Sequence, residues 1–144
     1  SDWAYTLHKA SGELRHTTLT PNGFRETEWG SRLESEPFFG VLGLATSQRV
    51  SSVPHSCEYG GNLDLKKLTE VAHCTFQFMS PVHSFLVGYG HARQGDGECC
   101  GTALETSVTG TLRLTLHKQH HSLKTVRAET KTALIGIGVE RFGG

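Results

Sequence analysis

Hydrophobic and polar residues alternate most regularly between residues 107 and 117. Leu112, Leu114 and Leu116 occupy every second position, so an extended chain places them on one face. The opposite face carries hydroxyl and basic side chains: Thr111, Arg113, Thr115 and His117. The pattern predicts a β-strand with one face for the core and one face for solvent or for a polyanion.

A second alternating stretch covers residues 125–139 and ends in an apolar run. Arg127 and Lys131 extend the basic character of the first strand, and residues 118–124 between the two stretches are typical of a hairpin connection. The sequence therefore predicts a pair of antiparallel strands here.

Two more strands are predicted at residues 74–79 and 82–89, separated by a Ser-Pro turn. In the first of these, Thr75 and Gln77 form the polar face. The apolar face consists of Cys74, Phe76 and Phe78. Residues 24–33 predict a further strand with Trp29 in the core, residues 37–44 predict a strand or a buried loop, and residues 90–101 predict a polar, glycine-rich loop.

Two helices are predicted. Residues 62–73 begin with Asn62, a good N-cap, and space their leucines on one side; residues 2–9 carry Trp3 and Tyr5 near the start of the chain. Together the elements predict an α+β fold, with a largely antiparallel β-sheet and one or two helices on one side, in a single domain spanning residues 1–144.

The charge of the chain is balanced but unevenly distributed. Fourteen basic and fourteen acidic residues give a net charge of zero, while residues 107–144 hold six basic residues against two acidic ones. A basic C-terminal part is a mild indication of a polyanionic partner. No apolar run approaches the about 20 residues that span a bilayer, so we expect no membrane association.

The cysteines favour a reducing compartment. None of the spacings between Cys57, Cys74, Cys99 and Cys100 suggests a disulfide framework. We therefore expect a cytoplasmic protein.

Two alternative chemistries involve these cysteines. Residues 95–101 resemble the Gly-Asp-…-Cys-Gly turn that carries the nucleophile of chymotrypsin-like viral cysteine proteases, with Cys99 or Cys100 as the thiol and His91 or Arg93 as the basic residues nearby in sequence. The more ordinary interpretation is a loop with incidental thiols.

The other alternative is a zinc site made by two histidine and two cysteine side chains: His55, Cys57, His73 and Cys74. The spacing lacks the usual gaps, which favours a buried structural cysteine at position 74. A further histidine cluster, at positions 117, 120 and 121, is by default a solvated turn. We therefore predict no metal and no other cofactor.

Several short motifs, read in order, resemble the small RNA-silencing suppressor of tombusviruses. They are Trp3 with Leu7-His8, the run from Gly23 to Gly30, and Cys74-Thr75-Phe76 continuing to Ser84, Val87 and Gly90. The resemblance implies a homodimer whose sheet holds a short RNA duplex, with tryptophans from N-terminal helices stacked on the duplex ends. On that basis Trp3 would be the stacking residue and Tyr5 the second aromatic.

The sequence thus predicts a non-enzymatic, sequence-independent double-stranded RNA-binding protein that is viral, dimeric and located in the host cytoplasm. Duplex RNA is recognised through phosphates and 2′-hydroxyls, which polar and basic strand faces can contact. The predicted RNA-binding residues are Trp3, Tyr5, Thr75, Gln77, Thr111, Arg113, Thr115, His117, Arg127 and Lys131. The alternatives are a viral cysteine protease and a non-catalytic structural or protein-interaction domain.

Overall fold

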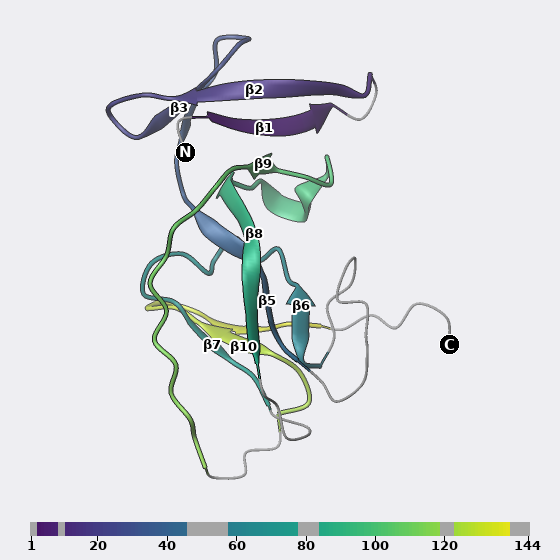
Figure 1. Ribbon diagram of the computed structural model, residues 1–144, viewed down its shortest axis with the longest axis vertical. Coiled ribbons are helices and arrows are strands. Elements are labelled where there is room, and N and C mark those ends of the chain that lie inside the picture. Colours follow the sequence, from purple (N-terminus) through teal and green to yellow (C-terminus); the bar gives the residue numbers. More distant parts are fainter. Residues whose placement is uncertain (1–2, 9–10, 46–57, 78–83, 119–122, 139–144) are drawn as a thin grey trace. The chain divides into compact units, whose positions relative to one another are not determined.

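The computed structural model describes residues 3–8, 11–45, 58–77, 84–118 and 123–138 (Figure 1). The chain divides into two compact units. Unit 1 comprises Ser1–Phe39 and Tyr89–Thr109, and unit 2 comprises Gly40–Gly88 and Gly110–Gly144. The organisation of the chain as one domain stays a prediction.

Unit 1 begins with four antiparallel strands in sequence order: β1 (Trp3–His8), β2 (Glu13–Leu19), β3 (Phe24–Thr27) and β4 (Arg32–Glu34). Figure 1 shows β1 and β2 side by side, and their register places Tyr5 opposite His16. The turn before β4 is closed by Thr27, whose hydroxyl accepts a hydrogen bond from the Ser31 N–H at 2.8 Å. Short, alternating segments separated by tight turns explain this meander.

The other side of β1 pairs with β9 (Leu104–Glu105), which in turn pairs with β8 (Phe85–Arg93). Glu105 lies opposite Tyr5 on one side and opposite His91 on the other. The core of unit 1 includes Ala92 and Leu104, with Leu33 packed against them. The pairing with β9 therefore involves the C-terminal end of β8, at His91 and Arg93.

Two strands pass from one unit into the other: β8 and β5 (Phe38–Leu44). The hydrogen-bonded order of the main sheet is β4-β3-β2-β1-β9-β8-β5-β6. Buried and half-buried residues alternate in the first half of β5, and its last residues, Leu42 to Leu44, are all buried. The apolar segment predicted as a strand or a buried loop is therefore a strand.

Unit 2 holds β6 (Gly60–Asn62), which pairs with β5, and a separate sheet of β7 (His73–Thr75), β10 (Arg127–Glu129) and β11 (Leu134–Gly136). The central strand β10 buries Ala128, which lies opposite Cys74. Gly60 has a φ of 92°, and a Cβ there would overlap the Leu42 carbonyl oxygen, so this position requires glycine.

The prediction of an α+β fold is wrong, because the part of the chain that the structure describes contains no α-helix. Its helical content is η1 (Asp96–Glu98), a 3-10 turn. The predicted helix at residues 2–9 is instead β1, where Trp3, Tyr5 and Leu7 occupy every second position and aromatic residues favour strands.

The predicted helix at residues 62–73 is replaced by the end of β6 and separate turns. The Leu68 N–H donates to the Leu65 carbonyl and the Ala72 N–H to the Thr69 carbonyl. Each bond joins residues three positions apart, whereas α-helical bonds join residues four positions apart. Asp64 and Val71 have φ values of 41° and 60°, which an α-helix cannot accommodate. The left-handed backbone at Asp64 and Val71 therefore prevents an α-helix, although the spacing of the leucines favours one.

The predicted strands also differ from the observed ones. Residues 110–118 are exposed and belong to neither sheet of the described structure, so the predicted hairpin with residues 125–139 is not formed. The second stretch forms β10 and β11 with a turn between them. Trp29, predicted in the core, lies in the turn between β3 and β4 and is 49% exposed.

The predicted loop at residues 90–101 begins only at residue 94, because β8 continues to Arg93. Among the described residues, no helix is long and apolar enough to cross a membrane.

Candidate functional site

His91 is the largest side chain that unit 1 buries completely, with 0% of its surface exposed. Its strand, β8, alternates Tyr89, His91 and Arg93 with Gly90 and Ala92. The pairing of β8 with β9 holds the strand at His91, and the register of this pairing shifts between His91 and Arg93. The polar imidazole of His91 is therefore buried where β8 pairs with β9.

Two aromatic rings fix the plane of the His91 imidazole. Phe38, itself buried, stacks on it with ring centres 4.8 Å apart and an angle of 6° between the planes. Tyr89 meets the ring edge-on, with centres 5.6 Å apart. Contacts of this kind orient a ring and exclude water from its faces.

A hydrogen bond selects the tautomer of His91. Its Nδ1 lies 3.1 Å from the backbone carbonyl oxygen of Tyr89. A carbonyl only accepts, so Nδ1 carries the proton and donates it, and in the neutral ring Nε2 keeps its lone pair. Histidines that bind metals show this arrangement, in which the second nitrogen donates to a backbone carbonyl.

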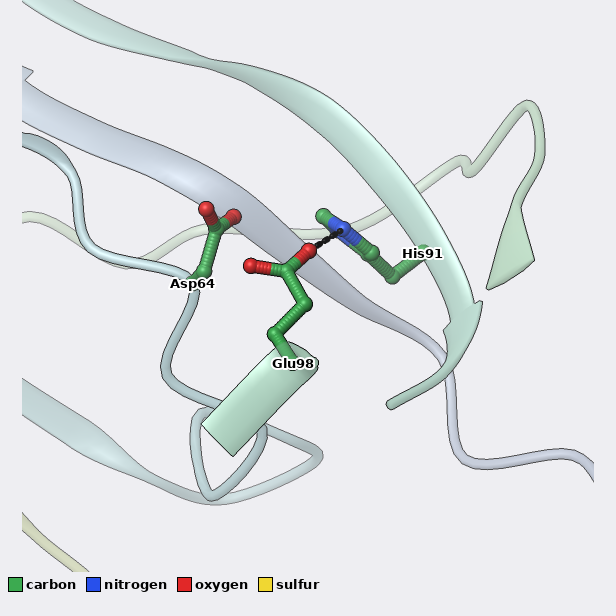
Figure 2. A group of neighbouring side chains, drawn as sticks. All are labelled: Asp64, His91 and Glu98. Carbon is green, nitrogen blue, oxygen red and sulfur yellow. Dashed lines mark ion pairs between the residues drawn. The ribbon is translucent and has the colours of Figure 1, made fainter. Parts of the chain in front are cut away.

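Glu98 faces the Nε2 side of the His91 imidazole, as Figure 2 shows. Its Oε1 lies 3.6 Å from Nε2 of His91, and the side chain is 17% exposed. The carboxylate extends from η1, where Gly97 has a φ of 71° and Glu98 itself a φ of 43°. The left-handed turn therefore reverses the chain after Arg93 so that Glu98 returns toward β8.

The distance between the two groups limits what can lie between them. At 3.6 Å the atoms are too far apart for a strong direct hydrogen bond. Two ligands of one tetrahedral zinc ion, each at about 2.0–2.2 Å, lie about 3.3–3.6 Å apart. The pair can thus form an imidazolium–carboxylate ion pair, or it can bind a divalent cation through a nitrogen and an oxygen ligand.

The backbone around the pair is strained. Of the non-glycine residues with positive φ, Tyr89, Glu98 and Ala103 lie in the segment that builds this site, at φ 59°, 43° and 49°. Each such conformation costs of order 1 kcal/mol and tends to occur at functional sites.

The strand end beyond His91 is anchored by Arg93. Its guanidinium donates to the Glu34 carbonyl oxygen at 2.6 Å and lies 3.7 Å from the Glu36 carboxylate. These contacts join β8 to the segment before β5 and hold the strand that carries His91.

Figure 2 also draws Asp64, which belongs to unit 2. Within that unit, the Asn62 side-chain amide donates to Asp64 Oδ2 at 2.7 Å, and the Asp64 N–H donates to the Gly40 carbonyl at 3.0 Å. The carboxylate therefore has a defined orientation in its own unit.

The residues predicted to bind RNA are distributed over both units. Trp3 and Tyr5 lie on β1 in unit 1, on a strand instead of the predicted helix. The others lie in unit 2. Thr75 ends β7 and Gln77 follows it, both half-buried; Arg127 lies on β10 and Lys131 in the next turn, both exposed. The exposed segment 110–118 carries the remaining four, Thr111, Arg113, Thr115 and His117.

The alternative sites are only partly within the described residues. His55, Cys57, His120 and His121 lie outside them. His73 is exposed on β7, and burial raises the pKa of the adjacent Cys74 thiol from 9.0 to about 12, which makes this sulfur a poor zinc ligand at neutral pH.

Sequence reasoning did not identify the His91–Glu98 pair, because residues 90–101 were expected to form one loop. A usable signal was present. No proline, asparagine or aspartate interrupts the sequence between Phe85 and Arg93, so the predicted strand could have been extended to include His91.

Comparison with known proteins identifies the family. The profile of the acetamidase/formamidase family matches residues 41–135, which is 95 of the 144 residues and includes both His91 and Glu98. The chain belongs to the acetamidase/formamidase family. No curated protein matches the sequence significantly.

Solved structures show the same fold as this acetamidase/formamidase family chain. An acetamidase from Yersinia enterocolitica superimposes with a TM-score of 0.66 and 22% identity, over 83% of this chain and 36% of the other. A recombinant predicted acetamidase/formamidase from the thermophile Thermoanaerobacter tengcongensis gives a TM-score of 0.64 and 21% identity, over 91% and 46%. The chain thus spans less than half the length of either protein.

Membership of the acetamidase/formamidase family overturns the predicted function. The resemblance to tombusvirus silencing suppressors is wrong, and so are the predictions of a viral, double-stranded RNA-binding, non-enzymatic protein and of a viral cysteine protease. The motifs behind that resemblance were short and separated by gaps, whereas the family profile matches a continuous segment. Trp3 also lies on a strand, without the helix that end-stacking was expected to use.

Proposed function

We propose that this chain forms part of an enzyme that hydrolyses a small carboxamide, with His91 and Glu98 activating the water. The proposal is supported by the family, by the names of the two structural relatives and by the site itself. The observation that carries it is the buried imidazole of His91, whose Nε2 faces the Glu98 carboxylate at 3.6 Å.

The reaction requires a nucleophilic water and a proton for the leaving nitrogen. Water adds to the amide carbonyl, the C–N bond breaks, and the nitrogen leaves as ammonia or an amine after taking up a proton. A carboxylate beside an imidazole can accept the proton of the water and return it to the nitrogen. Glu98 is suited to this role because its side chain retains 17% exposure, whereas His91 is buried.

A divalent cation held by His91 Nε2 and Glu98 would lower the pKa of a bound water and polarise the carbonyl. The tautomer of His91 favours such a cation, since the Tyr89 carbonyl keeps the proton on Nδ1. The stacked Phe38 ring maintains the orientation of the imidazole and restricts its access to water.

The direct test measures cation binding and amide hydrolysis with the same protein. We expect Zn²⁺ or Mn²⁺ to bind in a calorimetric titration, and ammonia to be released from formamide or acetamide. His91→Gln and Glu98→Gln should each reduce cation affinity and hydrolysis by at least about 100-fold. Asp64→Asn tests whether the carboxylate of unit 2 contributes to either measurement.

The matched control is Glu36→Gln, which neutralises a carboxylate of unit 1 that is paired with Arg93 on the surface. Binding and hydrolysis should be unchanged in this variant, and circular dichroism should show the same strand content in all variants. Hydrolysis that persists after complete chelation but is lost in Glu98→Gln would indicate acid–base catalysis without a cation. Hydrolysis unaffected by both substitutions would refute the assignment of the site.

A further inference from the structure

Cys99 and Cys100 are the two central residues of a tight turn that begins at Glu98. The Gly101 N–H donates to the Glu98 carbonyl oxygen at 2.7 Å, which closes the turn. Cys99 has φ −56° and ψ −24°, the values of the first central residue of a type I turn. Two thiols are therefore presented next to each other, directly after a residue of the candidate active site.

The two sulfurs are held by weak contacts on opposite flanks of this turn. Cys99 is exposed, and its thiol lies 3.8 Å from the carbonyl oxygen of Asp96, before the turn. Cys100 is half-buried, and its Sγ accepts the N–H of Ala103, after the turn, at 3.2 Å. Neither thiol is in a disulfide. Both sulfurs must therefore leave these contacts before they can bind one atom together.

We propose that Cys99 and Cys100 form a dithiol site for a thiophilic metal or metalloid, such as Cu(I) or trivalent arsenic. Soft thiolate ligands select such elements over hard cations. Simultaneous attachment to two neighbouring sulfurs gives a much higher affinity than attachment to one, because the second sulfur is already at high effective concentration.

A trivalent arsenic oxide serves as a probe without any change of oxidation state. Phenylarsine oxide reacts with two thiols, forms two As–S bonds and releases its oxygen as water together with the two thiol protons. Arsenic stays trivalent throughout, so the step requires no oxidant.

Occupation of the dithiol site changes the position of Glu98. The two sulfurs contact different flanks of the turn, and bringing them to one atom reshapes the turn whose first residue is Glu98. Figure 2 shows the Glu98 side chain extending toward His91 from η1, and Glu98 is also the first residue of the turn. We therefore expect ligand binding to disturb the 3.6 Å pair and, as far as the proposed function holds, to inhibit hydrolysis.

The test uses the full chain with Cys57→Ser, so that the remaining thiols are the three described ones. Phenylarsine oxide is added, the protein is desalted into 2-mercaptoethanol, and the intact mass is recorded. One arsenic should be retained per chain and be released only by a dithiol such as 2,3-dimercaptopropanol. Cys99→Ser and Cys100→Ser should each reduce the affinity about 100-fold, the lower range expected for loss of a second attachment.

Cys74→Ala is the matched control, because burial raises the pKa of that thiol to about 12 and keeps it unreactive. Retention should be the same as in the parent protein. Release of arsenic by 2-mercaptoethanol from the parent protein, or equal retention by Cys99→Ser, would overturn the dithiol site.

The coupling to Glu98 has its own readout, which does not depend on hydrolysis. The imidazole ¹⁵N resonances of His91 should shift when arsenic binds to the parent protein, and should not shift in Cys100→Ser at the same concentration. Retention of arsenic without such a shift would overturn the coupling. An inactive enzyme that nevertheless shows both retention and the shift would refute the proposed function alone.

Discussion

Two segments of the chain, the end of β8 and residues 110–118, differ in burial. In the second half of β8, Tyr89 to Arg93, the strand pairs with β9 and buries His91 and Ala92 completely. In residues 110–118 every residue is exposed, and Leu114 and Leu116 retain 71% and 66% exposure. Alternation defines two faces of a strand, but a face is buried only when another element covers it.

The segment that follows β9 covers β8, and the two backbones approach each other closely at Gly90. The Thr106 N–H donates to the Gly90 carbonyl at 2.9 Å, and a Cβ at position 90 would overlap the Thr106 carbonyl oxygen. The segment that follows β9 can therefore lie against β8 because a glycine stands there. Residues 110–118 have no such neighbour among the described residues.

Among the substitutions that compare the two segments, Phe38→Ala should have the largest effect on the free energy of unfolding. This buried ring stacks on His91, and its removal should lower the free energy of unfolding by about 3–5 kcal/mol. Leu114→Ala, in the exposed segment, should change it by less than about 0.5 kcal/mol. Urea unfolding of both variants measures the difference. Equal losses would contradict the contrast between the segments.

A smaller effect should come from Gly90→Ala. The added methyl group overlaps the Thr106 carbonyl oxygen and lies 2.8 Å from a methyl carbon of Val108, so unfolding should become easier by about 1–3 kcal/mol. Gly88→Ala is the matched control on the same strand, because a Cβ there meets nothing within 4 Å. Thermal unfolding of the two variants should differ in this order. A Gly90→Ala protein as stable as the control would show that β8 is not closely covered.

The pH dependence of unit 2 should carry a contribution from Cys74. Burial raises the pKa of its thiol from 9.0 to about 12 in the folded chain, so the unfolded chain loses the proton at lower pH. The stabilisation is fully present below about pH 9 and is lost as the pH rises toward 12. The melting temperature of the parent protein should fall more steeply over this window than that of Cys74→Ala. Parallel curves would contradict the burial of this thiol.

The smallest effect is expected for Glu36→Gln. Its ion pair with Arg93 spans 3.7 Å, and the two side chains are 53% and 34% exposed, so solvent screens the attraction. The free energy of unfolding should change by less than about 0.5 kcal/mol. Chemical denaturation at low and high salt checks this. A larger, salt-dependent loss would show that the end of β8 depends on the ion pair.

The sequence alone contained the residues of the candidate site but did not predict the contact between them. His91 was noticed as a basic residue near the cysteines, and Glu98 only as part of a loop. Their pairing depends on a left-handed backbone at Gly97 and Glu98, and a non-glycine residue gives little local sign of such a conformation. The same limit explains the helix predicted at residues 62–73, where Asp64 and Val71 adopt positive φ.

By itself, the sequence determined where the chain can form a two-faced strand in β10, because side-chain alternation is a local property of extended backbone. Only the tertiary structure decided which of those faces are covered, that β1 is a strand beside β2 and β9, and that His91 meets Glu98. Those outcomes depend on contacts between residues distant in the chain and on backbone conformations that packing imposes, and no local pattern encodes either of them.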